Sequence, residues 1–269
     1  MYALWQIFLS EFLSSTFALF VGLGVVANEH LNKTKGNEFG FGFVAFGFGM
    51  AFAIPLVIFG FVSAHLNPAM SLALFVLKKI DAIEALVCIG GEFLGMFVGA
   101  TLTFLLYFPH FRLPPEIDAE IASDELVVRD QKRKLAVFAT GPAVKIHWSH
   151  SFFVEVVCTT VLIASALGVY SRHEHIENPE IFAMYRNIEG LTIGWLVFVL
   201  VLALGGITSI AANPSRDFSP RLVHLMMPIE NKGSSNWSYA WIPFFAPFVG
   251  GVIGAYLFKA ISAITEFYI

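Results

Sequence analysis

Charged residues are scarce in this chain of 269 residues. Asp, Glu, Lys and Arg together make up 13% of it, whereas soluble proteins have about 25%. Hydrophobic residues account for 57%, and the mean hydropathy is +0.73. This composition excludes an ordinary soluble domain and indicates a protein that crosses a membrane several times.

Cysteine is nearly absent, and so is any long basic block. The two cysteines, Cys88 and Cys158, both lie in apolar runs, so a structural disulfide is not expected. The formal net charge of -4 argues against a nucleic-acid partner. No nucleophile with a base, metal-ligand cluster or nucleotide loop stands out, so we predict no enzyme, cofactor or metal site. His173 and His175 resemble a metal pair only weakly, and a solvated loop over 171–189 is preferred.

Six apolar stretches are long enough to cross a bilayer, which requires about 20 mostly apolar residues. They cover roughly 6–28, 39–63, 81–108, 150–171, 190–208 and 239–264. The polar interval 109–149 is predicted to be a solvated loop that can be helical in part. We therefore expect residues 1–269 to form one domain made of two halves, about 1–108 and 150–269.

Two further apolar segments are too short to span a membrane. They run from Asn67 to about Leu77 and from Asn213 to about Met226. Each opens with Asn followed by Pro, and this order is typical of a capped helix start. Such segments are tolerated at membrane depth when they are buried in protein or line a wet cavity. We therefore predict two re-entrant half-helices.

The second half of the chain repeats features of the first in the same order. The matched residues are Glu11, Thr16 and Gly24 with Glu155, Thr160 and Gly168; Asn67 and Pro68 with Asn213 and Pro214; and Gly95, Gly99 and Ala100 with Gly250, Gly254 and Ala255. Because each half has an odd number of spans, the second half must enter from the opposite side. The pattern predicts an inverted repeat whose half-helices meet by their N-termini.

Two helix N-termini that meet at mid-membrane would place positive partial charge at the centre of a passage. The amides of Asn67 and Asn213 could donate hydrogen bonds there, and residues 63–66 and 208–212 could present backbone carbonyls. Such a passage suits a neutral hydrogen-bonding solute and opposes cations, protons included.

Two sequence boxes resemble those of a known family. Ser-Ala-His-Leu-Asn-Pro-Ala at 63–69 and Asn-Pro-Ser-Arg-Asp-Phe-Ser-Pro-Arg-Leu at 213–222 resemble the paired Asn-Pro-Ala boxes of the aquaporin superfamily. Asp217 after Arg216, Arg221, and Trp-Ile-Pro at 241–243 resemble its glycerol-conducting branch. Thr-Lys-Gly-Asn at 34–37 and Asn-Lys-Gly-Ser-Ser at 231–235 resemble bacterial glycerol uptake facilitators.

The resemblance implies an all-α membrane fold of six transmembrane helices and two re-entrant half-helices. It also implies a homotetramer with one pore per subunit, in a bacterial plasma membrane with both termini cytoplasmic. The segments that this orientation places outside carry more Lys and Arg, so the positive-inside rule favours the opposite orientation.

The same resemblance implies a selectivity constriction of four residues. Arg216 would be joined by Val201, by Ile210, and by Phe46, or by Gly47 if no insertion is allowed. Water-selective relatives usually have His at the position of Val201. Its absence predicts a wider and more apolar constriction, in which the carbons of glycerol contact the wall and its hydroxyls bind Arg216.

Other residues are expected to support the half-helices rather than to contact solute. They are Pro68, Ala69, Pro214, Ser215, Asp217, Glu11, Glu155 and His65. Ser215 replaces the usual Ala and would add a hydroxyl near the pore centre, and Ser219 replaces a Gly. Glu92 stands where a Gln is common, and the sequence leaves open whether it is structural or faces the lumen.

The resulting prediction is a passive channel for glycerol, other small neutral polyols and water that excludes ions and protons. Urea, dihydroxyacetone or undissociated lactic acid are alternative solutes. A proton-coupled secondary transporter is a second alternative, suggested by the inverted repeat and by Glu11, Glu92 and Glu155. The alternative that involves no transport is a membrane adhesion or scaffold protein.

Overall fold

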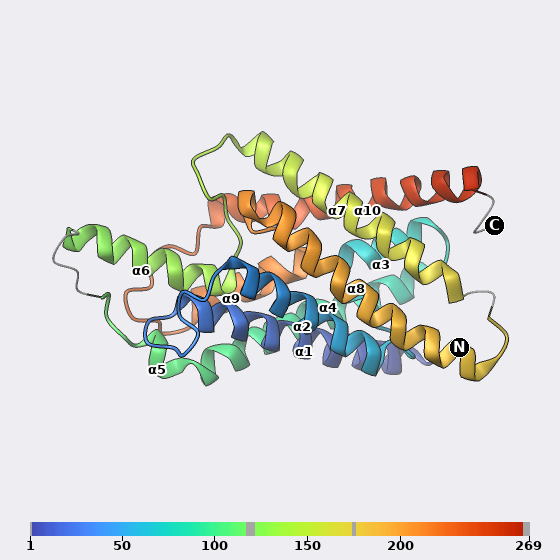
Figure 1. Cartoon of the computed structure of the whole chain (residues 1–269), viewed down its shortest axis with the longest axis horizontal. Helices are drawn as coiled ribbons and strands as arrows, with labels where there is room; N and C mark the ends of the chain where they lie inside the picture. The colour runs from blue at the N-terminus through green and yellow to red at the C-terminus, as the bar shows by residue number, and fades with distance from the viewer. Residues whose placement is uncertain (1, 117–121, 174–175, 266–269) are drawn as a thin grey trace.

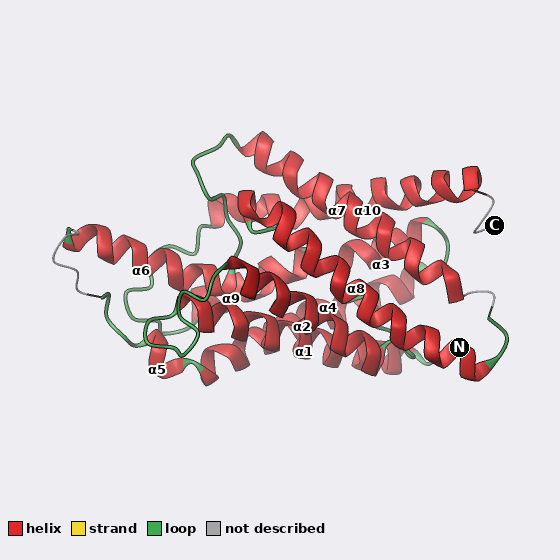
Figure 2. Cartoon of the chain, viewed as in Figure 1, coloured by secondary structure: helices red, strands yellow, loops and turns green. Residues whose placement is uncertain are grey.

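The computed structural model describes residues 2–116, 122–173 and 176–265, and this part of the chain is helical with no strand (Figure 2). The helices are α1 (Leu4–His30), α2 (Phe41–Phe59), α3 (Pro68–Val76), α4 (Ala82–Leu106), α5 (Phe108–Phe111), α6 (Ser123–Phe138), α7 (Trp148–Tyr170), α8 (Pro179–Thr208), α9 (Pro214–Met226) and α10 (Trp237–Thr265), with a 3₁₀ turn at Ser171–His173.

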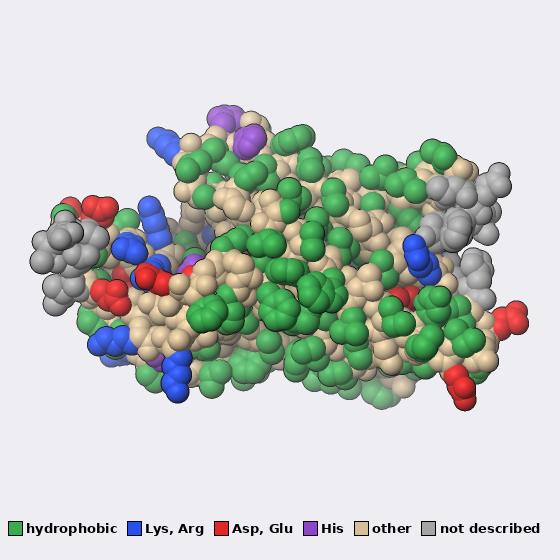
Figure 3. Space-filling model, in the orientation of Figure 1, with side chains coloured by type: hydrophobic (Ala, Val, Ile, Leu, Met, Phe, Trp, Pro, Cys, Tyr) green, Lys and Arg blue, Asp and Glu red, His purple; other side chains and the backbone are tan. Residues whose placement is uncertain are grey.

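Six of these helices, α1, α2, α4, α7, α8 and α10, are long and apolar enough to cross a membrane. The six predicted spans are therefore confirmed, and α3 and α9 are the two short helices expected between them. Large hydrophobic side chains cover the middle of the bundle, whereas charged ones gather toward its ends (Figure 3). This distribution matches an apolar bilayer core flanked by water.

One predicted boundary is wrong. The loop expected over 171–189 is largely helical, because α8 begins at Pro179, well before the apolar stretch that predicted it. The side chain of Asn178 caps this start by accepting from the backbone N–H groups of Glu180 and Ile181, at 2.9 and 3.2 Å. Hydropathy finds the apolar part of a helix, whereas the cap decides where the helix starts. His175 lies outside the described residues.

The described part of the polar interval 109–149 is partly helical, since it contains α5 and α6. Lys134 of α6 is only 2% exposed. Its ammonium donates to the carbonyls of Leu113 and Glu230 at 2.9 and 2.8 Å and to Asp130 at 2.8 Å. These bonds hold α6 against the segment before it, which contains Leu113, and against the segment after α9, which contains Glu230.

The long helices pack in matched pairs, α1 with α4 and α7 with α10. Gly95 and Gly99 face α1 so closely that a Cβ atom would lie 2.4 Å from the carbonyl oxygen of Phe12 and 2.6 Å from that of Thr16. Gly250 and Gly254 face α7 in the same way. Glycine at this spacing lets two helix backbones approach, as in small-residue contacts between membrane helices generally.

The two halves are related as an inverted repeat. The order of two long helices, a half-helix and a long helix occurs in α1–α4 and again in α7–α10. In Figure 1, α3 lies toward the end of the bundle that holds the start of α1 and the end of α10, and α9 lies toward the opposite end. The half-helices therefore enter from opposite sides, as the odd number of spans per half requires.

Replacing Gly95 with Ala should lower the melting temperature of the purified protein in detergent. The added methyl group would clash with the backbone of α1, and overpacking of this kind lowers the free energy of unfolding by about 1–3 kcal/mol. Gly168→Ala is the matched control, because nothing lies within 4 Å of its would-be Cβ. Equal melting temperatures for the two variants would contradict the close α1–α4 contact.

Candidate functional site

Each half-helix begins with an asparagine whose side-chain oxygen caps it. Asn67 Oδ1 accepts from the backbone N–H of Ala69 at 3.0 Å. Asn213 Oδ1 accepts from the N–H groups of Ser215 and Arg216 at 3.1 and 3.2 Å. Pro68 and Pro214 occupy the first helical position of α3 and α9. The caps use the side-chain oxygens and leave the amide nitrogens to point away from the helices.

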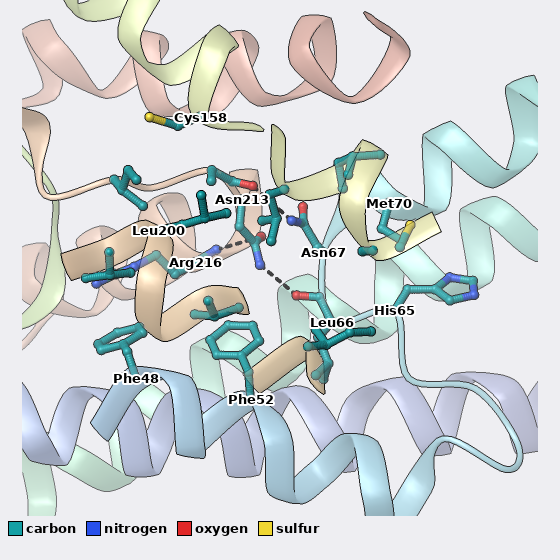
Figure 4. A pocket seen from close by; sticks show the side chains of 18 of the residues that line it. Phe48, Phe52, His65, Leu66, Asn67, Met70, Cys158, Leu200, Asn213 and Arg216 are labelled. Carbon is teal, nitrogen blue, oxygen red and sulfur yellow. Dashed lines mark hydrogen bonds between the residues drawn. The ribbon is translucent and has the colours of Figure 1, made fainter. Parts of the chain in front are cut away.

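Those amide nitrogens bind the opposite half of the chain. Asn67 Nδ2 donates to the carbonyl of Ala212 at 2.9 Å, and Asn213 Nδ2 donates to that of Leu66 at 2.6 Å (Figure 4). Leu66 and Ala212 have left-handed backbone conformations, with φ of 58° and 45°. Since an amide group carries two N–H donors, each asparagine keeps a second donor beyond the one that links the halves.

Glu11 holds the residues that precede α3. It is fully buried, and its carboxylate accepts from the Ser63 hydroxyl at 2.6 Å and from the N–H groups of His65 and Leu66 at 2.7 and 3.1 Å. Glu11, His65 and Cys88 bring possible metal ligands within 4.8 Å of one another. Because the carboxylate oxygens already accept these bonds, the cluster braces the backbone.

Glu155 does the same for the residues that precede α9. It is fully buried and accepts from the Thr208 hydroxyl at 2.8 Å and from the N–H groups of Ala211 and Ala212 at 3.1 and 3.0 Å. Each glutamate thus binds backbone N–H groups of the non-helical segment that precedes a half-helix. In the same segments, the carbonyls of Leu66 and Ala212 accept from the asparagines of the opposite half.

A cavity of about 80 Å³ runs past the two asparagines, which is several times the space that one water molecule needs. Both halves line it. The residues are Phe48, Phe52, Leu56, His65, Leu66, Asn67 and Met70 from the first half, and Cys158, Leu162, Ile163, Ala166, Tyr170, Ile193, Val197, Leu200, Val201, Ile210, Ala211, Ala212, Asn213 and Arg216 from the second. Most of this wall is apolar, and its polar groups come mainly from the segments around Asn67 and Asn213.

Arg216 stands where this cavity meets a second one of about 50 Å³, which reaches His30 and Thr140. Phe48, Val201 and Ile210 line both cavities together with Arg216. The guanidinium carbon of Arg216 lies 4.7 Å from the centre of the Phe48 ring. These four side chains line both cavities and are the candidates for the predicted constriction.

The expected position of Phe46 is therefore wrong. Its side chain is 45% exposed and packs edge-on against Trp195 and Phe198, with ring centres 6.3 and 5.8 Å away. The alternative, Gly47, is also wrong, because a Cβ there would lie 2.6 Å from the Val25 side chain. Phe48 occupies the place instead, since two residues along a helix turn the side chain by about 200°.

Asp217 and Ser215 are committed to bonds inside the protein. Asp217 accepts from the N–H and hydroxyl of Thr140, both at 2.7 Å, and from Arg221 at 2.8 and 3.0 Å. These bonds hold α9 to the segment that follows α6. The Ser215 hydroxyl, expected near the pore centre, is fully buried and donates to Asn213 Oδ1 at 2.8 Å. It therefore reinforces the cap and lines neither cavity.

His65 reaches the cavity, whereas Glu92 does not. His65 Nδ1 lies 2.9 Å from the Ser71 hydroxyl, which donates to Glu92 Oε1 at 2.8 Å. The N–H of Asn67 donates to the same oxygen at 3.2 Å. Glu92 is fully buried, lines neither of the two cavities, and binds the start of α3 through Oε1. Ala69 is also buried, and a Cβ on Gly251 of α10 would lie 2.7 Å from its carbonyl oxygen.

Two capped half-helices that meet inside a bundle, beside a narrow cavity lined by both halves of an inverted repeat, define a membrane channel. The chain belongs to the major intrinsic protein family, whose sequence profile matches residues 1–258.

Individual relatives agree with this assignment. The chain is 36% identical over 255 residues to a probable glycerol uptake facilitator protein of Thermotoga maritima, covering 94% of this chain and 98% of that protein. It is 32% identical to the glycerol uptake facilitator protein of Bacillus subtilis, covering 94% and 84%. The solved aquaglyceroporin from Plasmodium falciparum shares the fold, with a TM-score of 0.78 at 24% identity over 98% of this chain and 99% of that one.

Replacing Phe48 with Ala should widen the constriction and raise the size limit of neutral solutes that enter proteoliposomes. Phe46→Ala is the matched control on the same helix and should leave the size limit unchanged, since its ring lies outside both cavities. Stopped-flow light scattering with polyols of increasing length measures both. A larger effect for Phe46→Ala would overturn the assignment of Phe48.

Proposed function

We propose that this protein is a passive channel for glycerol and other small neutral polyols, and that it also conducts water. The observation that carries the proposal is that Arg216 lines both cavities together with the apolar side chains of Phe48, Val201 and Ile210. Relatives named as glycerol uptake facilitators support the same solute class.

The constriction suits an amphipathic solute. The carbon chain of glycerol contacts Phe48, Val201 and Ile210, while its hydroxyls accept from Arg216. Removing water from a hydroxyl without replacing its hydrogen bonds costs about 1–3 kcal/mol. The second donors of Asn67 and Asn213 and the nearby carbonyls replace those bonds along the passage.

Exclusion of ions and protons follows from the charge distribution. Two helix N-termini meet near the asparagines, and each carries about half a positive elementary charge. Arg216 adds a full positive charge at the constriction. A cation would lose its hydration shell against these positive groups, so the energy barrier for cations exceeds that for neutral solutes.

Other neutral solutes remain a second candidate class, because the apolar constriction accepts them too. Urea, dihydroxyacetone and undissociated lactic acid all combine small size with hydrogen-bonding groups. The secondary-transporter alternative is less well supported. Glu11, Glu92 and Glu155, which suggested it, are fully buried and line neither of the two cavities described above.

We further propose a homotetramer with one pore per subunit, placed in a bacterial plasma membrane with both termini cytoplasmic. The bacterial relatives support this setting. The start of α1 and the end of α10 lie at the same end of the bundle, in accord with termini on one side (Figure 1). The distribution of Lys and Arg between the loops favours the reverse orientation under the positive-inside rule.

Reconstitution into vesicles tests the channel directly. Glycerol entry should be driven by its gradient, should not saturate, and should be unaffected by a protonophore. Accumulation of a solute against its gradient would reject a channel in favour of coupled transport. Unchanged permeability after substitution of Arg216 would favour a scaffold role, and a panel of glycerol, urea, dihydroxyacetone and lactic acid ranks the solutes.

Val201→His should lower glycerol flux by about tenfold or more while reducing water flux less. The imidazole narrows the constriction and removes an apolar contact for the carbon chain, and a loss of about 1.4 kcal/mol corresponds to a factor of ten. Val201→Ala is the control and should preserve glycerol flux. Equal loss of both fluxes in Val201→His would show that residue 201 does not set selectivity.

A further inference from the structure

A hollow of about 600 Å³ lies outside the pore, at the end of the bundle that holds the start of α1 and the end of α10 (Figure 1). The ends of α3, α7 and α10 form it. Its lining combines apolar side chains with three lysines. Only Tyr170 is shared with the cavity at the asparagines, so the hollow is a separate site.

The polar part of the hollow is cationic. Three lysines line it: Lys78 and Lys79 from the end of α3, and Lys259 from α10. Lys78 and Lys259 form no ion pair with any carboxylate among the described residues. Asp81, the acid nearest to Lys78 in sequence, instead caps α4 by accepting from two backbone N–H groups at 2.8 and 2.9 Å. Within the described part of the chain, two positive charges thus face the hollow without a carboxylate partner.

Lys78 occupies a position at which glycine is the usual residue. It ends α3 in a left-handed conformation with φ of 60°. Its N–H donates to Phe75, and the N–H of Lys79 donates to Leu74, both at 2.9 Å. A helix end of this type favours Gly, because a Cβ atom strains the left-handed conformation. The chain therefore carries a lysine where glycine would stabilise the fold more.

The rest of the hollow is suited to hydrocarbon. Leu77, Leu167 and Phe258 line it. Lys259 projects from a stretch of α10 that is otherwise apolar at its surface, where Tyr256 is 57% and Ile264 is 82% exposed. This stretch belongs to a membrane-spanning helix, so acyl chains have access to it. A small soluble anion would use the lysines but would gain nothing from the apolar walls.

We propose that this hollow binds one anionic glycerophospholipid from the surrounding leaflet. The phosphate lies between Lys78 and Lys259 near the membrane surface, with Lys79 beside it, and an acyl chain packs against Leu77 and Leu167. Basic pockets between the helices of membrane proteins bind anionic lipid headgroups in general, and this hollow has the same positive charge next to apolar walls. The site does not depend on which solute the pore conducts.

Lipid binding to the full-length protein in detergent tests the proposal, with native mass spectrometry and thermal unfolding as readouts. Phosphatidylglycerol should bind and raise the melting temperature, whereas phosphatidylcholine with the same acyl chains should do so weakly. Inorganic phosphate is the third arm, at matched ionic strength. Displacement of phosphatidylglycerol by phosphate, or equal binding of the two lipids, would overturn the proposal, because the site would then be a free-anion site or an unselective apolar one.

The double variant Lys78→Gln, Lys259→Gln should weaken phosphatidylglycerol binding by about fivefold for each lysine, since a basic residue near an anionic lipid contributes about 1 kcal/mol. Lys132→Gln, Lys145→Gln is the matched control. It removes two exposed lysines at the opposite end of the bundle and should leave binding unchanged. If both double variants weakened binding equally, the effect would come from the net charge of the protein and not from the hollow, and the proposed site would be wrong.

Lys78→Gly separates lipid binding from folding. It removes the charge and also relieves the left-handed backbone, so the lipid-free protein should melt at a higher temperature than wild type. The additional stabilisation by phosphatidylglycerol should nevertheless fall. If lipid stabilised this variant as much as wild type, Lys78 would have no part in the site.

Discussion

The channel depends on one pair of reciprocal hydrogen bonds. The amide of Asn67 donates to Ala212, and the amide of Asn213 donates to Leu66, so each half of the chain binds the other where both half-helices begin. Two helix N-termini facing each other repel through their dipoles. A carbonyl from the opposite half placed against each side-chain amide offsets that repulsion and joins the two halves at this point.

The buried acids make this junction possible, and they do so differently in the two halves. Glu11 and Glu155 are equivalent by the repeat, and each accepts backbone donors from the segment before a half-helix. In the first half, Glu92 of α4 also accepts a hydrogen bond from the backbone N–H of Asn67. The second half uses the Asp217–Arg221 pair to hold α9. The repeat is thus symmetric at the junction and asymmetric in what supports it.

The two cation-bearing sites illustrate two uses of positive charge at a membrane. Arg216 is buried beside an aromatic ring and lines the cavity, where the proposed function places its charge against the passing solute. Lys78 and Lys259 are exposed at the end of the bundle beside apolar walls, where their charge acts on what surrounds the protein. Burial and the neighbouring side chains, rather than the charge itself, separate the two roles.

Local chemistry let the sequence by itself determine the spans, the half-helix starts and the repeat. Hydropathy over about 20 residues, an Asn-Pro pair and matched glycines each act within a few turns of chain, so no knowledge of distant contacts is needed. The start of α8 at Pro179 was also marked locally, by the capping Asn178, but hydropathy alone passed over it.

Only the tertiary structure decided which side chains face the passage. The stretch around Phe46, Gly47 and Phe48 is apolar on all sides, so its composition carries no information about which face of α2 meets the cavity. Packing of α2 against α1 and α8 sets that rotation and turns Phe48 inward. Rotation of a uniformly apolar helix is a property of its neighbours, and these are brought together only by the fold.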